Sequence, residues 1–378
     1  MNRLMRRLED GLKERREKGL LREVRLPGDL IDLSNNDYLS LAQNGEVKKA
    51  AIEAIEKYGC SSSASPLISG YKEAHDAFLK KVCEWCGFET GMIWNTGFAA
   101  NQAVLSGLPQ KGDLVLADRL IHNSMISGIL QSGARLMRYR HLDLEHLESL
   151  LVKERDAESI VFVVTESVFS MDGDYPDLKA MATLKERFDF VWLVDEAHAS
   201  GWYGEKGSGL VEESGVGQSV DVLVGTLGKG LGSMGAYTLF HEEALKTHFE
   251  NYASEFIYST YLPPSSVAAA GAAIDLIGKR KNERAWARQV SAGMRARLSE
   301  VGLDVMDGDS PILPVILGSV ERVAEARSFL EERGFAVGVI RPPTVPEGTS
   351  RLRISLKSDL DPSLLAGLAE ALEDFAKR

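Results

Sequence analysis

Two short segments hold the residue types best suited to chemistry. The segment GTLGKGLG, residues 225–232, places one lysine, Lys229, among four glycines directly after the apolar run 222–224. The segment VDEAH, residues 194–198, places Asp195 and His198 at the end of another apolar run. A lysine in a glycine-rich turn serves either to bind a nucleotide phosphate or to form a covalent bond with a carbonyl-bearing cofactor.

Nucleotide chemistry needs partners that the sequence lacks. A DEAH motif that binds magnesium in a helicase requires a GxxxxGK[ST] loop upstream of it, and this chain contains none. Gly228 and Lys229 lie downstream and are followed by Gly230 instead of serine or threonine. The glycine spacing of residues 225–232 also fails to complete a GxGxxG dinucleotide fingerprint. Neither an ATPase nor a dinucleotide-binding enzyme is indicated.

Pyridoxal phosphate does need a lysine and an acid of this kind. Its aldehyde forms a Schiff base with a lysine amine, and an acidic side chain keeps its ring nitrogen protonated. We therefore interpret Lys229 as the Schiff-base lysine and Asp195 as the partner of the ring nitrogen. Gly97 begins a predicted helix after an apolar run, and the amides at such a helix end favour a phosphate. Hydroxyl contacts are expected from Ser170 and Thr226.

Apolar runs alternate with helix-length amphipathic segments from about residue 90 to about residue 240. The runs are continuous and rich in β-branched residues, as expected for parallel strands that helices cover on both faces. They comprise residues 114–117, 160–164, 191–194, 222–224 and 236–239. The motifs lie at the ends of such runs, and ligands of α/β proteins bind at the carboxyl ends of the strands. The sequence predicts an α/β protein with a mostly parallel sheet.

The two ends of the chain have a different character. Beyond residue 275, charged helices alternate with strands at 312–316 and 351–356, which predicts a smaller α+β domain. Leu4, Leu8 and Leu12 recur at helical spacing, so an amphipathic helix that docks by this stripe is expected. We predict an N-terminal segment over residues 1–40, a large cofactor-binding domain over 41–275 and a small C-terminal domain over 276–378.

Composition narrows the class of protein. The 378 residues carry a net charge of −11, which disfavours a nucleic-acid partner because such a partner attracts a basic surface. No apolar run approaches the roughly 18 residues of a membrane span, and residues 1–25 lack the apolar core of a secretory signal. We therefore expect a cytoplasmic protein that contacts no membrane.

Cys83 and Cys86 form a CxxC pair without a second metal-ligating pair, so we expect them to pack at a helix end and expect no metal site. Four histidines have no partner that the sequence indicates: His141, His146, His241 and His248.

Taken together, the motifs resemble one known family. In chain order they read NTGFAAN, DRLIHNS, TESVFSMDGD, VDEAHASG, GTLGKGLG, YSTYLPP and RPPTVPEGTSRLRISL. They resemble the α-oxoamine synthases, pyridoxal-phosphate enzymes of the aspartate-aminotransferase fold, over nearly the whole chain. The resemblance implies fold type I, with a large, mostly parallel domain and a smaller α+β C-terminal domain. It also implies a homodimer with shared active sites.

The resemblance assigns roles around the cofactor. Lys229, besides forming the Schiff base, is implied to be the acid and base at the substrate α-carbon, and Asp195 holds the pyridine nitrogen. His198 is implied to contact the phenolic oxygen, and His122 to stack on the ring. The implied cofactor-binding set is Gly97, Phe98, His122, Glu166, Ser170, Asp195, His198, Thr226, Lys229 and Thr260.

Three further residues are implied to bind substrate. Arg353 resembles the residue that pairs with the amino-acid carboxylate, although its alternation with apolar neighbours also suits an arginine that faces solvent. Arg22 is implied to hold the acyl chain. Asn36, together with Thr260, is implied to reach in from the neighbouring subunit. One departure is Pro66, which stands where the family usually has an arginine and so removes a charge from that loop.

The family condenses an amino acid with an acyl thioester and releases carbon dioxide and a free thiol. The segments RPPTVPEGTSRLR and IYST most resemble the branch that joins L-alanine to a pimeloyl thioester in biotin biosynthesis. The alternative is a sister enzyme that uses glycine, either a glycine C-acetyltransferase or a 5-aminolevulinate synthase. A catalytically silent module is disfavoured because Lys229 is present. Coenzyme A and acyl carrier protein both stay open as the carrier of the acyl group.

Overall fold

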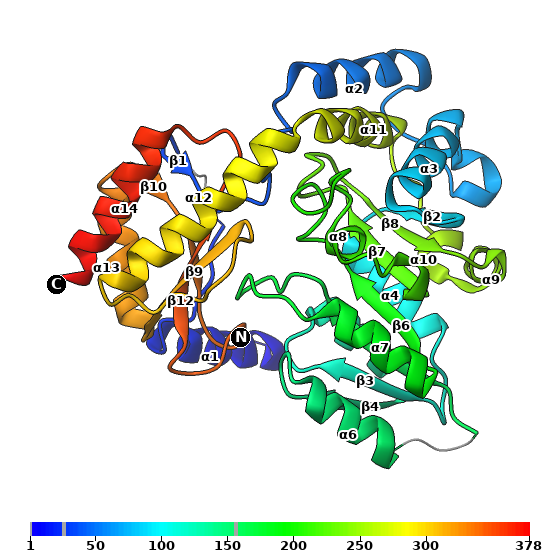
Figure 1. Cartoon of the computed structure of the whole chain (residues 1–378), viewed down its shortest axis with the longest axis horizontal. Helices are drawn as coiled ribbons and strands as arrows, with labels where there is room; N and C mark the ends of the chain where they lie inside the picture. The colour runs from blue at the N-terminus through cyan, green and yellow to red at the C-terminus, as the bar shows by residue number, and fades with distance from the viewer. Residues whose placement is uncertain (1, 25–27, 155–157) are drawn as a thin grey trace. The chain divides into compact units, whose positions relative to one another are not determined.

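The computed structural model describes residues 2–24, 28–154 and 158–378 (Figure 1). The chain forms two compact units. The smaller unit comprises Met1–Asn35, Met171–Gly173 and Ala287–Arg378, and the larger unit comprises Asn36–Ser170 and Asp174–Trp286. The domain boundaries predicted after residues 40 and 275 stay predictions.

A seven-stranded sheet forms the centre of the larger unit, in the order β2-β8-β7-β6-β5-β3-β4. Only β8 runs against the other six strands, so the predicted α/β fold with a mostly parallel sheet is confirmed. The strands are short, and nearly every residue in β2, β3 and β5 to β8 is buried, which explains why the sequence shows continuous apolar runs. The bounds are β2 (Thr90–Trp94), β3 (Leu114–Asp118), β4 (Arg135–Tyr139), β5 (Val161–Glu166), β6 (Val191–Asp195), β7 (Val222–Thr226) and β8 (Ala236–Phe240).

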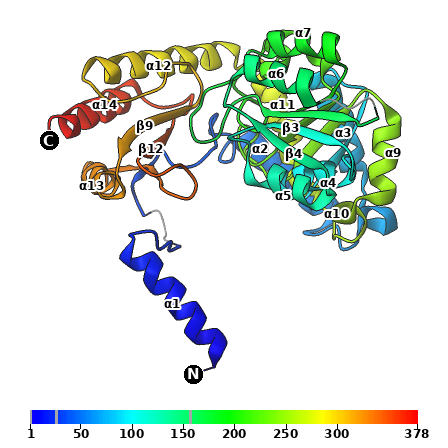
Figure 2. The same cartoon turned by 90° about the horizontal axis from the view of Figure 1, so that it is seen from below.

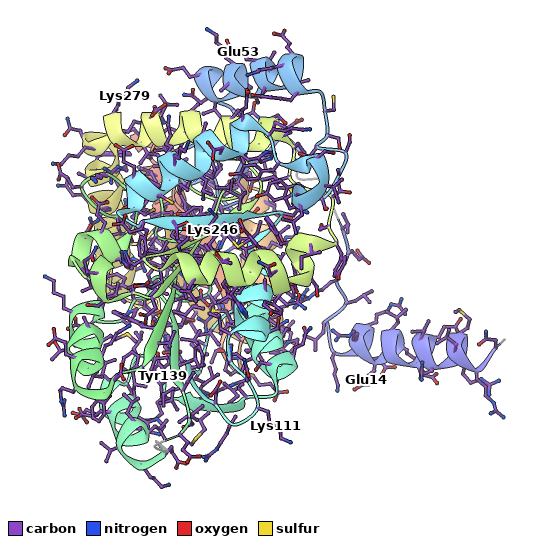
Figure 3. The ribbon with its side chains drawn as sticks, turned by 90° about the vertical axis from the view of Figure 1, so that its right-hand side faces the viewer. Glu14, Glu53, Lys111, Tyr139, Lys246 and Lys279 are labelled. Carbon is purple, nitrogen blue, oxygen red and sulfur yellow. The ribbon has the colours of Figure 1, made fainter. Side chains whose placement is uncertain are left out.

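Helices cover both faces of this sheet. Figure 2 shows α6 and α7 on one side of β3 and β4, with α4 and α5 on the other. Figure 3 shows charged side chains such as Glu53 of α2 and Lys279 of α11 on the outside of the unit. The helices are α2 (Gly45–Tyr58), α3 (Glu73–Cys86), α4 (Gly97–Gly107), α5 (Asn123–Ser132), α6 (Leu144–Glu154), α7 (Leu178–Phe188), α8 (Leu210–Ser214), α9 (Glu243–Tyr252), α10 (Ser254–Ile257) and α11 (Pro264–Lys279), with the short turns η1 (Pro66–Gly70) and η2 (Gly217–Ser219).

The smaller unit has an antiparallel sheet of three strands, in the order β11-β12-β9, and a parallel pair of β1 and β10. The strands are β1 (Ile31–Asp32), β9 (Ile312–Gly318), β10 (Phe335–Ala336), β11 (Gly338–Ile340) and β12 (Ser350–Ser355). The helices are α1 (Arg3–Glu17), α13 (Val320–Glu331) and α14 (Pro362–Ala376), and α12 (Lys281–Glu300) begins in the larger unit and continues in this one.

The N-terminal helix α1 exists as predicted, but its apolar stripe does not dock on the described part of the chain. Leu4, Leu8 and Leu12 are 44%, 48% and 49% exposed, and no residue of the helix is buried. Helical spacing reveals which residues share a face, whereas the surface that covers this face is a tertiary property. Within the described residues no helix combines the length and the apolar character that crossing a membrane requires.

Candidate active site

A cavity of about 200 Å³ lies at the carboxyl ends of the parallel strands in the larger unit. Lys229, Asp195, His198 and His122, the four residues predicted to be catalytic, all line it. Its full lining is Gly97, Phe98, Asn101, His122, Ser124, Glu166, Asp195, Ala197, His198, Thr226 and Lys229. Residues more than a hundred positions apart in the sequence are thus brought together as the strand-end argument predicted.

Asp195 is the last residue of β6 and is held rigidly. It pairs in register with Glu166, the last residue of β5, and is 5% exposed. Asn101 of α4 donates from Nδ2 to its Oδ2 at 2.7 Å, and the backbone N–H of Ala197 donates to its Oδ1 at 2.9 Å. These two donors fix the orientation of the buried carboxylate. Asn101 was not predicted, although it closes the NTGFAAN motif.

The loop after β7 carries Lys229 into the cavity. The backbone N–H of Gly232 donates to the carbonyl of Lys229 at 2.9 Å and closes a tight turn. A Cβ on Gly230 would lie 2.2 Å from the carbonyl oxygen of Ser200, so this position excludes every larger residue. Gly230, directly after the lysine, therefore permits close packing of two backbones. The Nζ atom of Lys229 lies 2.7 Å from Nε2 of His198.

The start of α4 offers backbone donors to an anion. The hydroxyl of Thr96 accepts from the N–H of Ala99 at 3.1 Å and caps the helix, which leaves the amides of Gly97 and Phe98 for another acceptor. A Cβ built on Gly97 would lie 3.7 Å from Thr226, at ordinary contact distance. The fold itself therefore tolerates a methyl group at residue 97, and the glycine serves to keep the cavity open.

Two titratable side chains in the cavity have altered proton affinities. Burial raises the pKa of Glu166 well above its ordinary range, and the nearby Asp195 carboxylate adds to the rise. Burial lowers the pKa of His122, whose Nδ1 accepts from the N–H of Ser124 at the start of α5. Burial thus favours the neutral form of both groups, and an uncharged His122 ring suits stacking against a flat cofactor.

The donor set fits pyridoxal phosphate, the cofactor expected from the sequence. Lys229 could supply an amine for the aldehyde, Asp195 a carboxylate for the ring nitrogen, and the start of α4 amides for the phosphate. Among the described residues, Oε1 of Glu166 and Oδ1 of Asn101 are buried in the cavity wall without a hydrogen-bond partner. Buried polar atoms of this kind call for a partner, which a polar ligand in the cavity can supply.

Some predicted site residues lie outside this cavity. Ser170 and Thr260 belong to the larger unit but do not line the cavity, and the carbonyl of Thr260 accepts from Asn95 Nδ2 at 2.7 Å. Asn36 does not line the cavity either, and its Oδ1 accepts from the hydroxyl of Tyr38 at 3.1 Å. Tyr38, which the sequence analysis missed, in turn lies 2.6 Å from Nδ1 of His198.

The two predicted substrate arginines belong to the smaller unit. Arg353 on β12 is 5% exposed and donates from Nη1 to Ser355 Oγ at 3.0 Å, so the solvent-facing alternative is wrong. Every residue of β12 is buried, so the strand lacks the alternation of buried and exposed side chains that the sequence suggested. Arg22 donates from Nη2 to Thr344 Oγ1 at 2.9 Å and lines a separate cavity of about 840 Å³, which Arg341 also lines.

The histidines without an indicated partner do have partners in the fold. His141 bridges two carboxylates, with Nδ1 2.8 Å from Asp118 and Nε2 2.9 Å from Asp174. Asp118 ends β3 and Asp174 lies in the loop between β5 and α7, 23 and 33 positions away, so no local pattern reveals them. The other contacts are to backbone groups of Arg140 for His146, Gly217 for His241 and Gly107 for His248.

Comparison with known proteins supports the assignment of this chain to a family of pyridoxal-phosphate enzymes. The family model for class I and II aminotransferases matches residues 28–372. An 8-amino-7-oxononanoate synthase of Geobacter sulfurreducens is 39% identical over 381 residues, which cover 97% of this chain and 97% of that protein. Two solved structures also match. A serine palmitoyltransferase of S. paucimobilis with a bound PLP–myriocin aldimine is 26% identical with a TM-score of 0.92, and the match covers 100% of this chain and 99% of that chain. An 8-amino-7-oxononanoate synthase of Francisella tularensis is 28% identical with a TM-score of 0.80, and the match covers 92% of this chain and 97% of that chain.

The fold therefore matches both a serine palmitoyltransferase and an 8-amino-7-oxononanoate synthase. The sequence identity is higher to an 8-amino-7-oxononanoate synthase, at 39%, than to the serine palmitoyltransferase, at 26%. The matches extend over both units. The chain therefore belongs to the class I and II aminotransferase family, within its branch of α-oxoamine synthases.

Proposed function

We propose that this chain condenses L-alanine with a pimeloyl thioester and yields 8-amino-7-oxononanoate, carbon dioxide and a free thiol in biotin biosynthesis. The observation that carries the proposal is a cavity lined by Lys229 and Asp195 in a chain 39% identical to a synthase of that product. The product name also speaks for alanine. Its amino group lies on the carbon beside a terminal methyl, and alanine brings that methyl, whereas glycine has none.

Pyridoxal phosphate is the cofactor, and when bound it withdraws electrons from the α-carbon of the amino acid. Lys229 would hold it covalently, and Asp195, fixed by Asn101, would keep its ring nitrogen protonated. The amides of Gly97 and Phe98 would bind its phosphate, with the Thr226 hydroxyl beside them. Ser170, in the loop after β5, is proposed to add a hydroxyl contact.

The chain's own groups then handle protons and substrate. Lys229 Nζ takes the proton from the α-carbon of alanine and returns one to the product. His198, whose Nε2 lies 2.7 Å from that nitrogen, would contact the phenolic oxygen of the cofactor. Burial favours the neutral form of Glu166, which disfavours a second negative charge beside Asp195. The uncharged His122 ring offers a flat surface.

Substrate recognition is proposed to involve arginine and amide donors. Arg353 would clamp the carboxylate of alanine, because a guanidinium matches a carboxylate with two parallel hydrogen bonds. Arg22 would assist the acyl chain, and Asn36 would contribute its amide nitrogen. We also propose a cytoplasmic homodimer in which Thr260 and Asn36 extend toward the neighbouring subunit's site, as the family resemblance implies. The acyl carrier is proposed to be coenzyme A or an acyl carrier protein.

The experiment that tests this function measures free-thiol release by the purified enzyme loaded with pyridoxal phosphate. L-Alanine with pimeloyl-CoA is compared with glycine plus acetyl-CoA and glycine plus succinyl-CoA. We expect release with the alanine pair, loss of release in Lys229→Ala, and unchanged release in Lys279→Ala, which alters an exposed lysine of α11. Release with a glycine pair alone would move the chain to a sister activity, and no release with any pair would refute the proposal.

A further inference from the structure

His141 contacts two carboxylates, one from each of two loops in the larger unit. Its Nδ1 lies 2.8 Å from Asp118 Oδ1, and its Nε2 lies 2.9 Å from Asp174 Oδ2. An ionised carboxylate only accepts hydrogen bonds, so both ring nitrogens need a proton and the ring is a cation. Burial lowers the pKa of His141, but the hydrogen bonds to the two carboxylates outweigh burial and raise the pKa to about 10.

The first of these carboxylates shapes the turn that leads to His122. Asp118 is the last residue of β3, and its Oδ1 also accepts from the backbone N–H of Leu120 at 2.8 Å. Its carbonyl accepts from the N–H of Ile121 at 3.3 Å. His122 follows directly, caps α5 and lines the candidate cofactor cavity. The carboxylate that contacts His141 therefore orders the turn before His122.

The second carboxylate closes the loop that contains Ser170. The backbone N–H of Phe169 donates to the carbonyl of Asp174 at 2.9 Å, so residues 170–173 form a loop whose two ends are joined. The edge of one ring faces the plane of the other where His141 meets Phe169, with ring centroids 4.5 Å apart. His141 therefore contacts both ends of this loop, through the Phe169 ring and through the Asp174 carboxylate.

The backbone beside His141 is fixed by the same carboxylate. Leu142 has a φ of +55°, in the left-handed region that leucine rarely adopts. Its N–H donates to Asp118 Oδ2 at 2.9 Å, while the neighbouring ring of His141 contacts Oδ1. An unfavourable conformation of this kind persists only where the surrounding contacts enforce it. The position of the His141 ring between the two loops is thus set by its own backbone as well as by its two partners.

We propose that His141 is a positioning residue of the active site, whose imidazolium joins the turn before His122 to the loop that contains Ser170 and so fixes both around the cofactor. The inference rests on the proposed roles of His122 and Ser170 as contacts of pyridoxal phosphate. His141 is not among the residues that line the cavity, so it acts through the two loops. Loops that are joined before the cofactor binds lose less conformational freedom when it binds.

The first measurement tests the bridge itself. The ring nitrogens of His141 are observed by ¹⁵N NMR in the full chain loaded with pyridoxal phosphate, and His141→Gln identifies the signals. We expect both nitrogens to carry a proton at about pH 7.5, where an ordinary histidine is mostly neutral. A neutral His141 ring at that pH would overturn the inference, because a neutral ring can donate to only one of the two carboxylates.

The second measurement is the affinity for pyridoxal phosphate, from an absorbance titration. His141→Ala should weaken binding by about tenfold or more, because the two loops are no longer joined. Val82→Ala is the control for lost stability, since Val82 is fully buried in α3 and does not line the cavity. It should lower the urea midpoint and keep the affinity within about twofold of the wild type. His146→Ala removes a nearby histidine that contacts the Arg140 backbone, and it should keep the wild-type affinity.

A double-mutant cycle distinguishes one bridge from two unrelated contacts. Asp174→Ala should weaken cofactor binding, and the double variant with His141→Ala should bind about as weakly as the weaker single variant. Losses that multiply in the double variant, or a His141→Ala affinity equal to that of the wild type, would overturn the inference. The titration does not depend on which thioester is the substrate, so failure of the proposed function is recognised separately, by absent thiol release in the loaded wild type.

Discussion

Replacing Glu196 by glutamine should remove a large part of the pH dependence of stability in the larger unit. Glu196 follows Asp195 and is 1% exposed. Its Oε1 accepts from the N–H of Val211 at 3.0 Å, and a Cβ on Gly209 would lie 1.3 Å from its Oε2. Burial raises the pKa of this carboxyl from 4.5 to about 8, against the lowering effect of its hydrogen bonds. A neutral carboxylic acid is therefore packed under the active site at neutral pH.

The sign and size of the effect follow from linkage. Because the folded state holds the proton more tightly than the unfolded state, stability is highest below pH 4.5 and falls as the pH rises toward about 8. A pKa difference of one corresponds to about 1.4 kcal/mol, so the full loss amounts to about 5 kcal/mol. Between about pH 5.5 and about pH 8.5, the wild type should lose about 3 kcal/mol more than the Glu196→Gln variant.

The assay is urea unfolding of the full chain followed by tryptophan fluorescence at both pH values. All five tryptophans belong to the larger unit, so the signal reports the unit that contains Glu196. Glu242→Gln changes an exposed glutamate and should keep the wild-type pH profile. If the wild type and Glu196→Gln lose the same free energy of unfolding between the two pH values, Glu196 is ionised in the fold and the reasoning is refuted.

Three further predictions concern other parts of the molecule. Gly97→Ala should weaken binding of pyridoxal phosphate at least tenfold, about 1.4 kcal/mol, because the added Cβ enters the cavity. It should leave the urea midpoint unchanged, because the Cβ meets Thr226 only at 3.7 Å. Cofactor titration by absorbance measures the change in binding. Asp172→Ala leaves buried Arg351 unpaired and should destabilise the smaller unit by about 3–5 kcal/mol, while adding Arg351→Met should restore most of it; hydrogen exchange in β12 distinguishes the two variants. Burial lowers the pKa of His141, but hydrogen bonds to its two carboxylate partners outweigh burial and raise the pKa to about 10. His141→Gln should therefore destabilise the larger unit most below about pH 6.5, and progressively less as the pH rises through about 10. Urea unfolding measures this effect.

The sequence by itself determined the parts of this protein that are encoded locally. Continuous apolar runs fixed the strands because a strand covered on both faces must be apolar throughout. Glycines around Lys229 and an acid at the end of a strand indicated a covalent cofactor, since that chemistry needs those two residue types. Parallel strands end at one edge of a sheet, so the shared cavity of Lys229 and Asp195 could be predicted without coordinates.

The tertiary structure decided everything that depends on which distant groups meet. Asn101 binds Asp195 across 94 positions and Tyr38 meets His198 across 160, and neither residue type is specific enough to reveal such a partner from the sequence. The protonation of Glu196 is likewise a result of burial, which no spacing rule encodes. The pattern of residues along the chain indicates which chemistry the protein performs. The protonation states and orientations of the side chains follow from tertiary contacts, because pKa values and hydrogen-bond partners depend on distance in space and not on distance along the chain.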